Sequence, residues 1–149
     1  MSSLRQQIAD ALVTRLKTIT VAHGYSVDVG NSVYCWRDLD NDPLHKADCP
    51  AITFEDGSAS METRNLDGDM LHVLSVSFTL HVSSSTTATT VRNGLNDIAK
   101  AIEGDETLGG LTLGYVPTEH SMDLHQDGDT IGAGTYAIEI TYLADRGLI

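Results

Sequence analysis

The chain has 149 residues and a formal net charge of −12 at pH 7, with 9 Lys and Arg against 21 Asp and Glu. A chain of this length can bury one hydrophobic core without support from disulfides or metal ions. The acidic balance argues against a protein that holds nucleic-acid phosphates, because such binding depends on Lys and Arg. No apolar run approaches the roughly 20 residues that span a bilayer, so no membrane partner is expected.

The N-terminal segment, residues 3–22, predicts an amphipathic helix. Its apolar residues recur every three or four positions. Ser3 and Gln6 fit a capping box at its start, and Gly24 stands where a glycine commonly ends a helix. Charged residues interrupt the apolar positions, which favours a mature helix in a protein made in the cytosol over a secretory signal.

The next part of the chain predicts strands. Two short strand-like pieces at 25–30 and 32–36 are followed by a third at 51–55. Residues 71–82 show the clearest pattern, and a turn is expected to pair them with residues near 60–64. Apolar and polar residues alternate along 71–82, which predicts a sheet with one buried face and one polar face. The buried set is Leu74, Val76, Phe78, Leu80 and Val82, and the polar set is Ser75, Ser77, Thr79 and His81.

A second helix is predicted over residues 86–103, where apolar residues again step by three and four. Gly94 lies inside this helix at a cost of about 1 kcal/mol relative to alanine, so we expect a close packing contact there. A short strand at 111–116, a loop at 117–129 and a last strand at 134–143 complete the chain.

Together these elements predict a single domain, residues 1–149, of the α+β class. Each helix has one apolar stripe, and the mostly antiparallel sheet has one apolar face. A two-layer sandwich buries all three surfaces when both helices pack on the same face of the sheet. The other face stays polar, which suits solvent or a wet contact with another subunit.

The acidic loop, residues 37–50, combines several aspartates with other metal-ligand residue types. Asp38, Asp40 and Asp42 stand at alternate positions, as at the start of an EF-hand loop. Pro43 then replaces the glycine that such a loop requires, and the position of the bidentate glutamate holds a cysteine. We therefore interpret the segment as a solvated connection and predict no metal site in it.

Two further groups of metal-ligand side chains also match no known pattern. Cys35, His45 and Cys49 fit no zinc spacing, and the two histidines within 120–125 stand five positions apart. A metal-binding module or metal-dependent hydrolase that uses 38–49 and 120–125 remains an alternative. The two cysteines are expected to be reduced, although a bridge closing the acidic loop is geometrically conceivable. Nucleophile-elbow and phosphate-loop motifs are absent from the sequence, so no catalytic residue, reaction or cofactor is predicted.

Three segments carry a resemblance to a known family. They are the helix LRQQIADALVTRLKT, the strand-to-helix unit LHVLSVSFTLHVSSSTTATTVRNGLNDIAKAIEGD and the closing strand GTYAIEITYLADRGLI. In the order and texture of its elements the chain resembles the tail terminator proteins of long-tailed bacteriophages, the minor tail protein U group. The resemblance covers most of the chain.

This resemblance implies a structural role without catalysis. Such terminators form a ring, a hexamer, that stops growth of the tail tube and presents a surface for the head. The implied partners are further copies of the chain, the tail tube protein and a head-completion or connector protein. DNA passes through the ring without specific binding, and the ring belongs to the virion tail, assembled in the host cytoplasm. Another head–tail joining or tail-completion protein is the nearest alternative.

Nine residues are candidates for contacts in such a ring. Acidic residues within 38–69 are expected to line the channel or the ring surfaces, because an acidic lining does not trap DNA. The polar strand face, with His81 as a surface or interface histidine, is expected to contact a neighbour. The apolar C-terminal residues either do the same or dock on their own domain. The candidate set is Asp38, Asp40, Asp42, Ser75, Ser77, Thr79, His81, Leu148 and Ile149.

Overall fold

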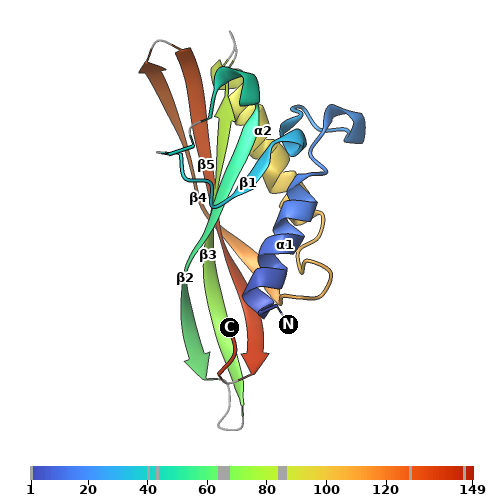
Figure 1. Cartoon of the computed structure of the whole chain (residues 1–149). Coiled ribbons are helices and arrows are strands. Elements are labelled where there is room, and N and C mark those ends of the chain that lie inside the picture. The colour runs from blue at the N-terminus through green and yellow to red at the C-terminus, as the bar shows by residue number, and fades with distance from the viewer. Residues whose placement is uncertain are drawn as a thin grey trace.

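The computed structural model of the chain shows two helices packed against a five-stranded mixed sheet, which confirms the predicted α+β class (Figure 1). The strand order is β1-β2-β3-β5-β4, and only the β1–β2 pair is parallel. The elements are α1 (Leu4–Leu16), β1 (Val33–Cys35), β2 (Ala51–Thr63), β3 (Asp69–Val82), α2 (Thr87–Glu103), β4 (Gly114–Asp127) and β5 (Asp129–Asp145). The structure describes residues 2–39, 41–42, 44–63, 68–83, 87–127, 129–145 and 147–149.

Long strands dominate the sheet, and its two outer long strands bulge at the same level. Strand β3 pairs with β2 on one side and with β5 on the other over most of its length. The register shifts in β2 after Asp56 and in β4 after Pro117, and the two residues lie opposite Val76 and Ile138 of the same row. Because bulges increase local twist, the sheet turns strongly through this level, as the ribbon in Figure 1 shows.

The hydrophobic core lies between the helices and one face of the sheet, as the alternation in β3 predicts. Leu74, Phe78 and Leu80 are fully buried there, and α2 packs against β3 and β5. The close contact expected at Gly94 is confirmed, because a Cβ atom at that position would lie 2.3 Å from the Leu80 Cδ2 atom. A side chain at position 94 would force the end of the Leu80 side chain to shift, so glycine favours this close approach of α2 to the sheet.

The first helix is shorter than predicted, and residues 25–30 do not form a strand. Helix α1 begins with Gln6 N donating to Ser3 Oγ, as expected, but it ends at Leu16 rather than at residue 22. The Thr18 hydroxyl donates to the Arg15 carbonyl at 2.6 Å, and such side-chain bonds compete with a continuing helix. The following segment contains short 3-10 turns, and Gly24 ends one of them with a φ of 89°.

The predicted loop at 117–129 is also wrong, because β4 continues through most of it. Strand β4 runs from Gly114 to Asp127, pairs only with β5, and leaves its other edge uncovered by any described strand. An edge strand alternates less clearly than a central one, since neither of its side-chain rows is as fully buried. The expected strand at 111–116 accordingly starts later, at Gly114.

A buried carboxylate ties the segment after α1 to the second helix. Asp97 of α2 is 1% exposed and accepts hydrogen bonds from the backbone N–H groups of Ser26 and Val27, at 2.9 and 3.0 Å. These bonds divert the backbone of 25–30 from strand pairing. Burial raises the pKa of Asp97 above its ordinary value and outweighs these hydrogen bonds.

Replacing Asp97 tests this tie. The Asp97→Ala change leaves two N–H donors without an acceptor, so we expect the free energy of unfolding to fall by about 2–4 kcal/mol. Asp97→Asn is the matched control, because it keeps an acceptor oxygen and avoids the cost of burying a charge, and it should lose less than half as much. Urea unfolding of the three proteins measures this. Equal losses for both variants would contradict the assigned role.

Among the described residues, neither helix is long and apolar enough to cross a membrane.

Candidate interaction surfaces

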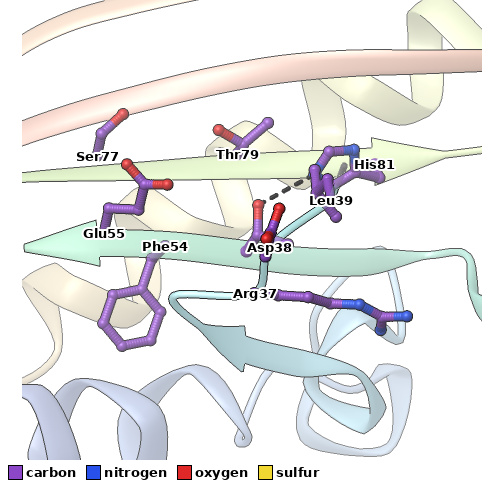
Figure 2. Close-up of a pocket in the computed structure, with 9 residues that line it drawn as sticks. Arg37, Asp38, Leu39, Phe54, Glu55, Ser77, Thr79 and His81 are labelled. Carbon is purple, nitrogen blue, oxygen red and sulfur yellow. Dashed lines mark hydrogen bonds between the residues drawn. The ribbon is translucent and has the colours of Figure 1, made fainter. Parts of the chain in front are cut away.

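The face of the sheet opposite the two described α-helices carries the predicted polar row. Figure 2 shows Glu55 and Ser77 pointing to this open face, while Phe54 points to the other side, into the core. We call this side the open face and define it by the polar row of β3 and its neighbours in register on β2, β4 and β5. Ser75 is exposed, and Ser77 and Thr79 are partly exposed.

Part of the acidic loop lies over the upper end of the open face. Arg37, Asp38 and Leu39 line one hollow together with Ser77, Thr79 and His81, so the fold brings one predicted aspartate to the predicted strand row (Figure 2). The sequence alone does not reveal that Asp38 lies near the polar row of β3, because this depends on the path of the acidic loop back across the sheet. The remaining lining residues of the hollow are Thr53, Phe54 and Glu55.

The other predicted aspartates do not join this hollow. Asp42 is exposed and forms a salt bridge of 3.2 Å with Arg37, while the Asn41 amide donates to Asp38 Oδ2 at 2.6 Å. Asp40 lies outside the described residues. The loop thus holds itself together by local polar contacts, and of the two described aspartates only Asp38 lines the hollow.

His81 differs from the expected surface histidine, because it is only 9% exposed. Its Nε2 atom lies 3.1 Å from the Thr53 hydroxyl on the adjacent strand. Burial lowers the pKa of His81, and the nearby Arg37 charge lowers it further. The ring is therefore neutral at pH 7, and the charges at the hollow come from Arg37 and the carboxylates Asp38 and Glu55.

The lower end of the open face carries a group of apolar side chains beside the exposed Glu62, and the sequence analysis missed this group. Leu71 lies directly opposite Leu143 in the β3–β5 register, and Val73 follows on the same face. Val116 of β4 belongs to the same face and is 60% exposed. The signal was present in the sequence, since Leu71 and Val73 share the parity of Ser75. The predicted outward row, however, begins only at Ser75.

The C-terminal residues Leu148 and Ile149 do not bury their side chains on their own domain. They are 60% and 55% exposed, although the Ile149 carbonyl accepts a long hydrogen bond of 3.5 Å from Arg5 N at the start of α1. Together with Leu143 they border a shallow hollow at the lower end of the sheet. This hollow is roughly 30 Å along β3 from the one beside His81, given the rise per residue of a strand.

The single tryptophan is held by a partly buried ion pair on β2. Trp36 adopts a left-handed backbone with φ of 57°, its side chain is 57% exposed, and its indole N–H donates to Asp56 Oδ1 at 2.6 Å. Arg5 from α1 donates to the other carboxylate oxygen at 2.7 Å and also to the backbone carbonyl of Asp56. An exposed aromatic side chain held in one position is a typical anchor for a protein–protein contact.

This cluster predicts a specific loss of stability in acid. Burial acts to raise the pKa of Asp56, but hydrogen bonds from Trp36 and Arg5 outweigh it and lower the pKa below the ordinary value of 3.8. A lowered pKa means that the stabilisation is complete above about pH 4 and is lost as the pH falls through the folded-state pKa.

We therefore expect urea unfolding midpoints of the wild type to drop between pH 5 and pH 2 by more than those of the variant Asp56→Asn. Fluorescence of Trp36, the only tryptophan, reports the transition directly. Parallel curves for the two proteins would show that Asp56 is not responsible for the acid sensitivity.

The alternative metal sites at 38–49 and 120–125 are described only in part by the structure. Among the described residues, no group of three or more His, Cys, Asp or Glu side chains lies close enough to hold a metal ion. His120 borders a groove beside α2, and the side chains of Asp123 and His125 lie outside the described set. Cys35 and Cys49 are free thiols rather than a disulfide.

The fold and these surfaces define a small α+β protein whose two described α-helices cover one face of the sheet. No protein-family model and no curated protein matches this chain. Function is therefore inferred from the chain's own residues and their arrangement.

Proposed function

We propose that the protein is a structural subunit of a long-tailed bacteriophage, which caps the growing tail tube as a ring, six-membered as in the terminators it resembles, and provides the surface for head joining. The observation that carries the proposal is the open face of the sheet. It is built from long strands, lies opposite both described α-helices, and carries exposed apolar side chains toward its lower end. A surface of this kind is typical of a subunit whose open sheet face is covered by a neighbour.

The distribution of charge supports the same role. Asp38 and Glu55 lie beside the open face, and the chain as a whole carries a net charge of −12. Acidic surfaces repel the phosphates of DNA, so a ring made of such subunits lets DNA slide through its channel without binding it. The proposed partners are the tail tube protein on one side of the ring and a head-completion or connector protein on the other. Assembly takes place in the host cytoplasm, and the product remains in the virion tail.

The exposed apolar residues support contacts with those partners. Trp36, Val116 and Leu148 are each more than half exposed and lie on different parts of the molecule. Tryptophan in particular contributes a large share of the binding energy at protein interfaces. Several separate contact points are expected of a subunit that touches two neighbours, a tube and a connector.

Tail length in a phage that carries a nonsense mutation in this gene tests the proposal. We expect electron micrographs to show tubes that run far past the normal length and carry no heads, because tube growth has lost its stop. Supplying the wild-type chain in trans is the control and should restore tails of normal length.

Two other results would change the assignment. Tails of normal length that fail to join heads would identify the chain as a neck component, which is the second candidate function. Intact, infectious particles would remove both structural roles.

A further inference from the structure

The exposed stripe of α2 carries positive charges, whose spacing is close to that of two negative charges on the open face. Arg92, Asn96 and Lys100 are all exposed and follow one another at every fourth position. The two cationic residues are therefore about 12 Å apart along the helix axis, at 1.5 Å per residue. In α1, Arg5 donates to Asp56 and Arg15 to the Ala101 carbonyl, and both are only partly exposed, so α1 presents no comparable pair of exposed positive charges.

The open face carries several exposed carboxylates, including Glu62 of β2 and Glu119 of β4, and two others lie at a similar separation. Glu55 of β2 lies opposite Ser77, and Glu139 of β5 lies opposite Ser75, so the two are two strands and two residues apart. With about 4.8 Å between strands and 3.4 Å per residue, their Cα atoms are roughly 12 Å apart. Both carboxylates are exposed, and only small polar side chains of β3 lie between them.

We infer that the open face of one copy binds the exposed stripe of α2 of the next copy, with Glu55 and Glu139 facing Arg92 and Lys100. The amide of Asn96 then lies over the hydroxyl groups of Ser75 and Ser77 and can both donate and accept hydrogen bonds. This inference rests on the proposed ring and specifies how its subunits contact one another.

Charge decides between this contact and a symmetric one. If two open faces packed against each other, Glu55 and Glu139 of both copies would meet, and facing like charges oppose association. A face-to-helix contact brings opposite charges together. It is also heterologous, since each copy uses two different surfaces, and such contacts close into rings when the rotation between neighbours permits.

The residues around the stripe leave its cations accessible. Lys100 lies 6.0 Å from the centre of the Tyr25 ring, a distance that allows it to turn toward a new partner. Glu103, one turn further along α2, accepts a hydrogen bond from the Tyr115 hydroxyl at 2.6 Å. That carboxylate is thus engaged within its own domain.

Disulfide trapping between two single-cysteine chains tests the contact. Both chains carry Cys35→Ser and Cys49→Ser to remove the native thiols. The helix chain also carries Asn96→Cys, and the sheet chain carries Ser75→Cys, so all four charged residues stay in place. Under mild oxidation at high protein concentration we expect a disulfide-linked dimer from the mixture and little from either chain alone. A full chain with both new cysteines should give a ladder of larger species.

Charge reversal then separates this contact from chance collisions. Glu55→Lys with Glu139→Lys in the sheet chain should lower the yield of mixed dimer about tenfold, because like charges now face each other. Adding Arg92→Glu with Lys100→Glu to the helix chain should restore the yield, which also shows that the reversed chains fold. The matched control is Asp10→Lys with Glu106→Lys in the sheet chain, an equal change of net charge away from the contact, and it should leave the yield unchanged.

Each contrary result overturns the inference. Dimers of the sheet chain alone, formed as readily as mixed dimers, would establish a symmetric face-to-face contact instead. Absence of mixed dimers, or a yield that ignores the charge reversals, would exclude the contact. The proposed function is judged separately by tail length: overlong tails without trapping would reject only this contact, whereas trapping with normal tails would reject only the tail-capping role.

Discussion

Burial of one face of the sheet is the constraint on which the rest of the structure depends. Strands β3 and β5 run beside each other for fourteen residue pairs, and their inward side chains form most of the sheet's contribution to the core. Because side chains alternate along a strand, a slip of one residue would exchange the buried and open faces. The same register that buries Phe78 therefore also places Ser75 and Ser77 outward and brings Glu139 beside Ser75.

Two buried carboxylates join the remaining segments to this sheet-and-helix core. Asp97 holds the segment after α1 against α2, and Asp56 holds both α1, through Arg5, and the end of β1, through Trp36. Their pKa values move in opposite directions, because burial prevails at Asp97 while donors from Trp36 and Arg5 prevail at Asp56. In both cases one carboxylate connects parts of the chain that are distant in sequence. Hydrophobic burial alone would not fix the relative positions of these parts.

Much of the fold followed from periodicity, whereas the composition of the surfaces did not. The alternation along 71–82 predicted the buried row correctly, and the three-and-four spacing predicted both helices. Strand β4 was missed because an edge strand with polar side chains on both rows resembles a loop. The meeting of Asp38 with His81 depends on how the acidic loop returns across the sheet, and no local pattern encodes that path. Burial of His81 depends on the same return.

Acidic and basic residues that are separated along the sequence lie on different surfaces of the fold. From the acid-rich middle of the chain, Asp38 and Glu55 lie at the open face, while Arg92 and Lys100 are exposed on α2. A surface and its complement thus occur on opposite layers of one molecule. Two complementary surfaces on opposite layers lead to head-to-tail contacts between successive copies rather than to a symmetric dimer. The angle between the two layers then decides whether the successive copies close into a ring. The strong twist of the sheet at the paired bulges contributes to that angle, so the positions of Asp56 and Pro117 influence the geometry of any ring the subunit forms.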